Sequence, residues 1–217
     1  MKKIILALDV NTEGTALKLV EDLSPWVDLF KIGPILFIKS GPALIKKVIA
    51  LGRDVFLDLK FHDIPATVKR SVESAAELGV YSLTIHSSGG EEMIREAVSV
   101  VKRPKIWAVT VLTSQFASKD IVVERAVLSK KCGADGVIAS PLEIAAVKAA
   151  CGKAFEVITP GIRTEKSNDD QKRIATPGAA IDAGADFIVV GRPIIEAKDP
   201  RLAAKSIYEE LLNHGTK

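Results

Sequence analysis

The sequence has little of several features that would classify a protein at once. It has two cysteines, Cys132 and Cys151, and no Cys-x-x-Cys spacing, so neither a disulfide framework nor a zinc site is indicated. Each cysteine precedes a glycine, and we interpret both as packing residues in a reducing cytosol. No apolar run approaches the ~20 residues that span a bilayer. The N-terminal apolar run meets Asp9 too early to be a signal peptide. These absences predict a cytoplasmic protein without a membrane partner.

A large excess of charge is also missing. The net charge is +3 and the basic residues are scattered, which speaks against a nucleic-acid partner. A mildly basic protein can still bind a small anion, because the potential of one cleft decides this. With 47% hydrophobic and 26% charged residues, the chain has the composition of a globular protein that buries a substantial core.

What the sequence does have is a repeated unit, in which a helical stretch ends in glycine and a short apolar, β-branched run follows. Glycine is favoured after a helix because the left-handed conformation costs it little. Runs that are almost continuously apolar are typical of parallel strands covered on both faces. The five copies are Gly52 before residues 54–60, Gly79 before 81–86, Gly133 before 136–140, Gly152 before 155–159 and Gly184 before 186–190.

Three more runs, residues 4–9, 29–33 and 105–112, bring the number of predicted strands to eight. Helical segments such as 15–23 and 202–212 follow them. Eight βα units in this length predict a closed (β/α)8 TIM barrel. An open doubly wound sheet is the alternative, but the first strand lacks the glycine-rich turn that it would want. No linker interrupts the series, so we expect one catalytic domain over residues 1–217.

Charged residues gather at the predicted strand ends, where (β/α)8 enzymes have their active sites. The first three strands supply Asp9, Lys31, Asp58 and Lys60. Side-chain alternation places Asp58 and Lys60 on one face of the third strand. Burying charges is expensive, so four of them suggest a function. We expect a preorganised network with Lys60 as proton donor, the alternative being a structural ion pair that closes the barrel.

The segment 57–68, Leu-Asp-Leu-Lys-Phe-His-Asp-Ile-Pro-Ala-Thr-Val, resembles the signature of the orotidine 5'-monophosphate decarboxylase family. Its Asp-x-Lys-x-x-Asp part is shared with related sugar-phosphate decarboxylases, whereas the Ile-Pro-x-Thr that follows is more specific. The resemblance extends along the chain through Ala7-Leu8-Asp9, Lys31-Ile32-Gly33, Thr159-Pro160-Gly161-Ile162-Arg163, Asp170-Gln171 and Gly191-Arg192-Pro193-Ile194.

This resemblance implies cofactor-free, metal-free decarboxylation of orotidine 5'-monophosphate to uridine 5'-monophosphate in de novo pyrimidine biosynthesis. Lys60 would protonate C6 of the pyrimidine, and Asp58 would lie near the departing carboxylate. Asp9 and Lys31 would hold ribose hydroxyls, with Lys31 also keeping Asp58 in position. Asp63 and Thr67 would reach into the neighbouring subunit's site, which implies a homodimer with shared active sites.

The resemblance also implies that Ser114 contacts the pyrimidine amide edge, although a serine there can equally cap a helix. Residues 115–118 depart from the family's usual sequence after this serine, so no further contacts of that loop are carried over. Pro160, in the matching segment after the seventh strand, is expected to bind substrate. The histidines His62, His86 and His214 are interpreted as structural.

A phosphate site is expected from the barrel alone, because barrels commonly bind phosphate with the loops after strands seven and eight. Those loops supply Gln171 and the Gly191-Arg192 turn. Gly191 allows close backbone approach and Arg192 offers a forked donor. The alternative for Gly191 is simply a helix start. Arg163 lies near this loop without an assigned role.

Two other functions compete. A metal-dependent decarboxylase of the same superfamily, such as 3-keto-L-gulonate 6-phosphate decarboxylase, would offer a glutamate to magnesium where this chain has Lys31, and a cation there repels a metal ion. A phosphate-ligand binding protein without turnover would not need a proton donor between carboxylates, and Lys60 stands between Asp58 and Asp63.

Overall fold

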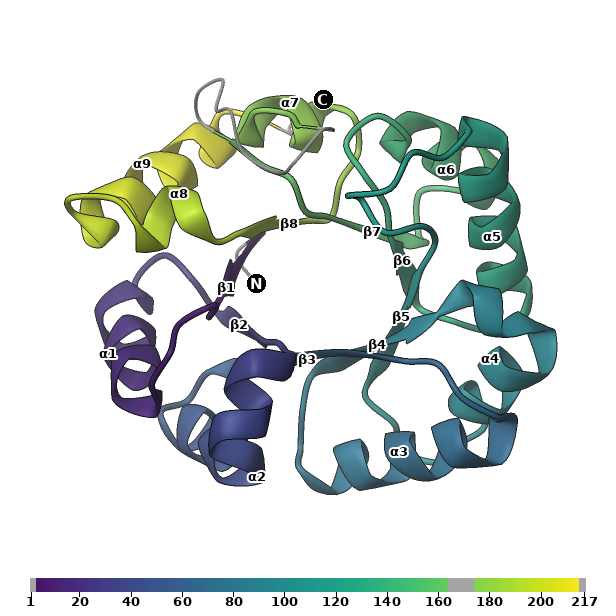
Figure 1. The fold of residues 1–217 in the computed structure, drawn as a ribbon. Helices are drawn as coiled ribbons and strands as arrows, with labels where there is room; N and C mark the ends of the chain where they lie inside the picture. Colours follow the sequence, from purple (N-terminus) through teal and green to yellow (C-terminus); the bar gives the residue numbers. More distant parts are fainter. Residues whose placement is uncertain (1–2, 164–173, 215–217) are drawn as a thin grey trace.

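The structure is a computed structural model that describes residues 3–163 and 174–214. In these ranges eight parallel strands pair in chain order and close into a barrel surrounded by helices (Figure 1). The predicted (β/α)8 barrel is confirmed. The strands are β1 Ile4–Ala7, β2 Leu29–Ile32, β3 Asp54–Phe61, β4 Ser82–His86, β5 Lys105–Val109, β6 Gly136–Ile138, β7 Glu156–Thr159 and β8 Phe187–Val190.

The helices follow the strands and form the outer ring. They are α1 Glu13–Leu23, α2 Pro34–Ala50, α3 Pro65–Glu77, the short 3-10 helix η1 Ser87–Gly89, α4 Gly90–Val98, α5 Lys119–Lys131, α6 Ile144–Cys151, α7 Pro177–Asp182, α8 Arg192–Ile195 and α9 Pro200–Leu212. All five glycines of the repeated unit have positive φ, between 72° and 105°, as a left-handed residue after a helix requires. The two cysteines beside them are buried and free.

Each strand begins within one residue of its predicted start, but some end earlier than predicted. β5 ends at Val109 instead of residue 112, and β1 ends at Ala7 instead of Asp9. The chain leaves the ladder there to line the mouth of the barrel. Leu8 is still buried and Val111 and Leu112 are partly buried in the cavity wall, so the apolar run extends beyond the paired strand.

Two layers of apolar side chains make up the core. The larger layer lies between the strands and the helices, and the smaller one fills the inside of the barrel. Trp107, Phe56 and Phe187 form the centre of the inner layer, with ring centroids of Trp107 and Phe56 4.8 Å apart. Trp107 pairs in register with the first residue of β6. The aromatic plug therefore occupies the half of the barrel nearer the N-terminal strand ends and leaves the other half open.

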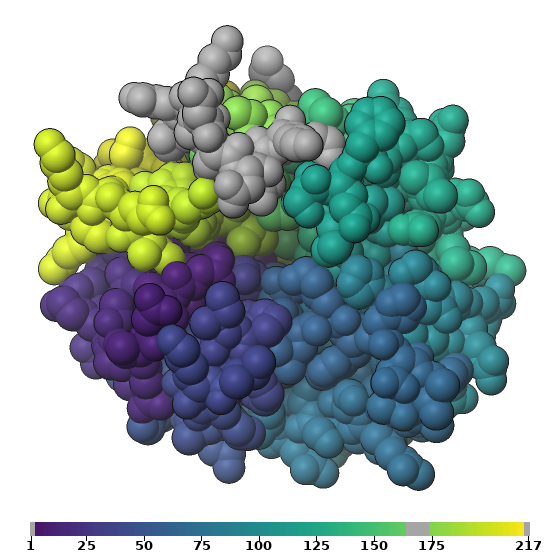
Figure 2. All heavy atoms as spheres, viewed as in Figure 1, coloured from purple at the N-terminus to yellow at the C-terminus, as the bar shows by residue number. Residues whose placement is uncertain are grey.

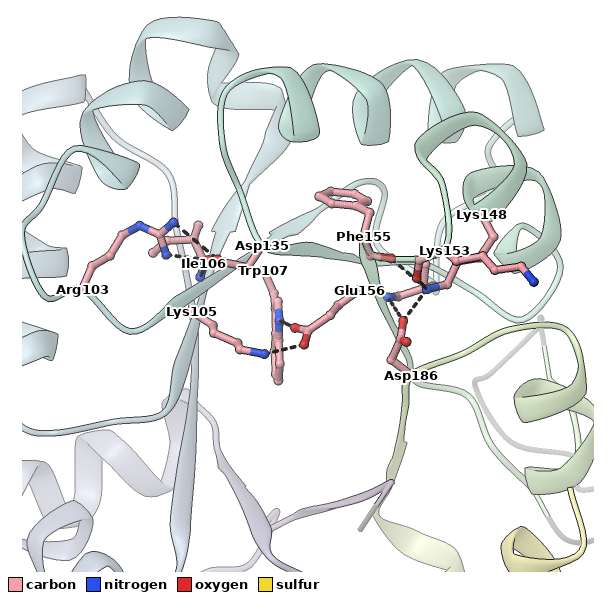
Figure 3. Close-up of polar contacts among 11 residues, drawn as sticks. Arg103, Lys105, Ile106, Trp107, Asp135, Lys148, Lys153, Phe155, Glu156 and Asp186 are labelled. Atoms are coloured by element: carbon pink, nitrogen blue, oxygen red, sulfur yellow. Dashed lines mark hydrogen bonds and ion pairs between the residues drawn. The ribbon is translucent and has the colours of Figure 1, made fainter. Parts of the chain in front are cut away.

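Carboxylates join neighbouring strands at the N-terminal end of the barrel (Figure 3). Asp135 accepts a hydrogen bond from the Ile106 amide, and Asp186 accepts one from the Val157 amide, both at 2.7 Å. Asp135 also pairs with Arg103, and Asp186 with Lys148. Both aspartates follow a Gly-Ala step at a helix-to-strand turn. In these two copies of the repeated unit, an aspartate before the strand therefore connects that strand to the preceding one.

The same end holds one more carboxylate, Glu156, which accepts a hydrogen bond from the Trp107 indole at 2.9 Å and pairs with Lys105. This contact satisfies the polar atom of a side chain that is otherwise fully buried. The Glu156 carboxylate therefore stabilises the packing of Trp107 in the barrel core.

The first and last parts of the chain lie side by side in the closed ring (Figure 2). β1 pairs with β8, and α1 contacts α9. Closure requires this contact, since the barrel has no free sheet edge. In the described part of the chain, no helix is long and apolar enough to cross a membrane.

Candidate active site

A cavity of about 250 Å³ opens at the C-terminal ends of the strands. Apolar side chains of the inner layer, among them Phe56, Val109, Ile138 and Val189, form its floor and walls. Charged groups from five strands or the segments after them lie around it, namely Asp9, Lys31, Asp58, Lys60, Arg163 and Arg192. Apolar walls of low dielectric strengthen the electrostatic interactions of the charged groups at the mouth of the cavity.

Four of these charges alternate in sign along one line. The Lys31 Nζ lies 3.3 Å from Asp9 Oδ1 and 3.4 Å from Asp58 Oδ2. The Lys60 Nζ lies 2.8 Å from the same Asp58 oxygen. The network predicted from the sequence is therefore present, with Asp58 between two ammonium groups.

Asp58 is the most enclosed member, with 7% of its surface exposed. Burial alone raises the pKa of a carboxyl group, but the Lys31 and Lys60 charges, together with hydrogen bonds from Lys60 and Thr84, outweigh it and hold the pKa of Asp58 below its ordinary value. The group is thus a carboxylate at neutral pH.

Lys60 reaches this position through an unusual backbone. Its φ is +52°, and only one other non-glycine residue among those described has a positive φ. A non-glycine residue in the left-handed region costs about 1–3 kcal/mol. From the Leu57–Leu83 pair to the Phe61–Ile85 pair, β3 advances four residues while β4 advances two. The resulting bulge turns the end of β3 and directs Lys60 into the cavity.

Gly33 makes room for the Lys31 ammonium at the start of α2. A Cβ atom at Gly33 would lie 3.3 Å from Lys31 Nζ and 3.7 Å from Asp9 Oδ1. Any larger side chain would compete with the ion pair for this space. Glycine is therefore favoured at position 33, because it leaves space for the Lys31–Asp9 ion pair.

The side of the cavity formed after β7 and β8, across the barrel from β3, carries two arginines and exposed backbone. Pro160, Gly161 and Arg163 from the segment after β7 line the cavity together with Gly191 and Arg192 from the segment after the neighbouring strand β8. A short backbone pairing holds the first segment, with the Arg163 amide donating to the Ala175 carbonyl at 3.0 Å. The expected phosphate-binding loops thus come together here. Gln171 lies outside the described residues.

Residues 2–207 match the family described as orotidine 5'-phosphate decarboxylase / HUMPS. The chain belongs to this family. A protein of Syntrophomonas wolfei named orotidine 5'-phosphate decarboxylase is 46% identical over 97% of this chain and 98% of its own, and one of Trichlorobacter lovleyi with the same name is 44% identical. The chain is accordingly an enzyme of this family.

Solved structures of the family have the same fold. The orotidine 5'-phosphate decarboxylase of Lactobacillus acidophilus matches with a TM-score of 0.81 at 36% identity over 97% of this chain and 99% of that chain. That of Pyrococcus horikoshii matches with a TM-score of 0.83 at 25% identity, covering 96% and 99%.

Some family residues expected at the site do not line this chain's own cavity. Asp63, just before α3, and Thr67, in its first turn, are exposed and are not among the cavity-lining residues, and the Asp63 carboxylate accepts a hydrogen bond from the Ile64 amide. Ser114 is also exposed, beside the lining residue Thr113. These placements neither bring the three side chains to the cavity nor assign them another role.

The structure adds three residues that sequence reasoning left without a role. Arg163 and Thr113 line the cavity. Thr84, fully buried on β4, donates to Asp58 Oδ1 and accepts from the Lys60 amide, both at 2.9 Å. Arg163 belongs to the Thr159–Arg163 motif that resembles the family, so the sequence offers a signal for it. Thr84 offers no signal, because a threonine in an apolar strand is ordinary.

Proposed function

We propose that this enzyme decarboxylates orotidine 5'-monophosphate to uridine 5'-monophosphate without a cofactor. The observation that carries the proposal is the Lys60 ammonium held 2.8 Å from a buried carboxylate inside a cavity whose far side is cationic. A proton donor at one end and an anion site at the other fit a substrate with a reacting carbon and a phosphate. The curated relatives named above carry this activity in their names.

In the proposed reaction the bond between C6 and the carboxyl carbon breaks, carbon dioxide leaves, and the electron pair stays on C6. Lys60 then gives one proton to C6 and recovers it from water. Before that transfer, the ammonium stabilises the developing negative charge, and such preorganised electrostatic stabilisation is usually the largest contribution to a rate enhancement. An ammonium already fixed by Asp58 needs little reorganisation when the charge appears.

Asp58 has two roles in this proposal. It holds Lys60 and Lys31 by their ammonium groups, and it faces the departing carboxylate of the substrate. The carboxylates of Asp58 and of the bound substrate repel each other, which raises the free energy of the ground state. Decarboxylation removes the substrate carboxylate and with it this repulsion. Lys31 and Asp9, the next members of the line of charges, would bind ribose hydroxyls.

The cationic side would bind the phosphate. Arg192 and Arg163 supply forked donors, Gly191 and Pro160 shape the backbone, and Gln171 of the same segment completes the set. Thr113 in the cavity wall, with Ser114 beside it, would meet the amide edge of the pyrimidine.

A metal-dependent sugar-phosphate reaction is the second candidate, because the family includes more than one activity. The position of Lys31 favours the metal-free reaction. Its ammonium lies between the carboxylates of Asp9 and Asp58, where a divalent cation would have to bind.

The proposal includes a homodimer. Asp63, Thr67 and the 66% exposed Ile64 form a surface segment directly after the catalytic strand, which fits a segment that enters a partner's site. We also propose that residues 1–217 form one catalytic domain and that the enzyme works in the cytoplasm, where its two free cysteines stay reduced.

Chelator-treated protein incubated with orotidine 5'-monophosphate tests the function. Loss of the substrate's ultraviolet absorbance without added metal is expected, and magnesium should not increase the rate. A parallel sample with a sugar-phosphate acid should show no carbon dioxide release. Turnover of the nucleotide only after magnesium is added, or none at all, would refute the proposal.

A further inference from the structure

The Thr84 hydroxyl contacts both Asp58 and the backbone of Lys60. Thr84 lies on β4 between the Leu57–Leu83 and Phe61–Ile85 pairs, opposite the bulge of β3 that carries Lys60. The hydroxyl accepts the Lys60 amide proton and donates its own proton to Asp58 Oδ1, both at 2.9 Å. Because a hydroxyl has one proton, both contacts together fix its orientation.

These two contacts act on the two groups that the proposed reaction uses. Asp58 Oδ2 faces the Lys31 and Lys60 ammonium groups, so the bond at Oδ1 fixes the remaining rotation of the carboxylate. The bond to the Lys60 amide holds the left-handed residue from which the ammonium extends. Because the bulge shifts the register of β3 against β4, no carbonyl of β4 is aligned with the Lys60 amide. Without the Thr84 hydroxyl this amide would lack an acceptor on β4.

We propose, on the basis of the function proposed above, that Thr84 is a positioning residue: its hydroxyl sets the Asp58 carboxylate and the Lys60 backbone in the arrangement that directs the Lys60 ammonium at the reacting carbon. It does not touch the cavity, because it is fully buried behind Asp58. Its effect on the reaction therefore passes through these two neighbours.

Thr84→Val tests this inference, because valine keeps the shape and removes both hydrogen bonds. The expected result is a kcat at least about tenfold lower, while the dissociation constant of uridine 5'-monophosphate changes less than about threefold. The acid limb of kcat against pH should move to higher pH, since Asp58 loses a donor to its charged form. Thr84→Ser retains the hydroxyl and should stay within about threefold of the parent kcat.

Thr110→Val is the matched control. Thr110 is also buried, at the end of β5, and its hydroxyl donates to the Ile138 carbonyl at 2.8 Å without contacting Asp58. Its loss should lower thermal stability about as much as Thr84→Val does, yet change kcat less than about threefold. An equal loss of kcat in both variants would mean that the barrel wall, rather than the hydroxyl, matters, and the inference would be wrong.

The inference would also be overturned if folded Thr84→Val kept the parent kcat and acid limb, or if serine failed to rescue. Should valine prevent folding, as judged by circular dichroism, Thr84→Ala gives the same comparison with serine. Carboxyl carbon-13 NMR of Asp58 in the substrate-free protein should show a higher titration midpoint in Thr84→Val. That measurement separates this inference from the proposed function, because it needs no turnover.

Discussion

Lys60 is the proposed proton donor, and it also has an unfavourable left-handed backbone conformation. Residues held in sparsely populated backbone regions persist only where the surrounding structure fixes them, and they concentrate at active sites. Here the surroundings are the bulge in β3, the Thr84 hydroxyl and the Asp58 carboxylate. These contacts hold the strained backbone and thus position the ammonium group before a substrate binds.

Replacing Lys60 tests both its chemistry and its strain. Lys60→Ala should keep nucleotide binding and lose far more than about tenfold in rate, which corresponds to about 1.4 kcal/mol of transition-state stabilisation. Lys60→Gly should be equally inactive but about 1 kcal/mol more stable than Lys60→Ala, because glycine adopts a φ of +52° without a Cβ clash. Single-turnover kinetics and urea unfolding measure the two effects. A native-like Lys60→Ala with a rate within tenfold of the parent would refute the general-acid assignment, and equal stability of the two variants would refute the strain.

His86 is a second residue whose environment can be tested. Burial, then the neighbouring His62, Lys60 and Arg125 charges, lower the pKa of His86 below 6.5, and Asp58 opposes them only in part. The unfolded chain therefore binds more protons than the folded chain just below pH 6.5. Stability contributed by neutral His86 is present above that pH and is lost as pH falls through the lower folded pKa.

We expect that His86→Gln flattens the decrease of the free energy of unfolding between about pH 7 and pH 5. With three histidines in the sequence, proton NMR can follow the titration of each imidazole. A His86 midpoint at or above 6.5, or an unchanged pH dependence in the variant, would contradict the expectation.

Among the secondary-structure elements, the strands have different roles at their two ends. The C-terminal ends of β1, β2 and β3 bring charges to the cavity, whereas the N-terminal ends carry carboxylates that bind neighbouring strands. At the N-terminal end, Asp135 and Asp186 each accept a hydrogen bond from a backbone amide in addition to forming an ion pair, so these two carboxylates stabilise the barrel. The two ends should respond differently to mutation.

Asp186→Ala should lower the free energy of unfolding by about 1–3 kcal/mol, because the Val157 amide and Lys148 ammonium lose their acceptor. Its kcat should remain that of the parent, since Asp186 lies at the end of the barrel away from the cavity. Glu209→Ala, which removes an exposed ion pair with Lys205, is the control and should cost at most about 0.5 kcal/mol. Urea unfolding compares the three proteins. Equal costs for both variants would show that the carboxylate does not join the strands.

The segments after β7 and β8 lead to a prediction about specificity. Arg192→Ala should weaken recognition of the phosphate, so kcat/KM for orotidine 5'-monophosphate should fall while that for phosphate-free orotidine stays nearly equal to the parent's. Arg192 lines the cavity beside Gly191 on its cationic side, away from Asp58 and Lys60. Steady-state kinetics with the two substrates separate the cases. An equally large defect with orotidine would place Arg192 at the reacting end.

How far the sequence predicts these elements depends on the kind of signal. The five glycines after helices gave the repeated unit and hence the barrel, because a positive φ has a strong residue preference. Strand ends such as that of β5 were overestimated, since apolar residues continue into the cavity wall. The left-handed conformation of Lys60 could not be predicted from the sequence, because tertiary contacts such as the one with Thr84, and not a local preference of lysine, hold it. Alternation did predict that Asp58 and Lys60 share a face.

At the scale of the whole molecule, the closed barrel gives each chain a complete ring of strands but leaves the segment with Asp63, Ile64 and Thr67 exposed beside its own site. A twofold dimer would bring the same segment of each subunit to the other, because an isologous interface uses one patch twice. In the proposed dimer, Asp63 of each subunit therefore completes the active site of the other.

Subunit mixing of Lys60→Ala with Asp63→Ala tests the shared site. If Asp63 acts across the interface, one site of a mixed dimer receives both defects and the other receives neither, whereas action within one chain leaves a defect in each site. Random exchange makes about half of the dimers mixed, so about one quarter of parental activity should return. Exchange is verified by mass spectrometry of differently tagged chains, and Lys60→Ala mixed with itself gives the background. Activity that stays at this background after full exchange would mean that Asp63 serves its own chain, because only a contribution from the partner can restore an intact site in a dimer whose two chains are both defective.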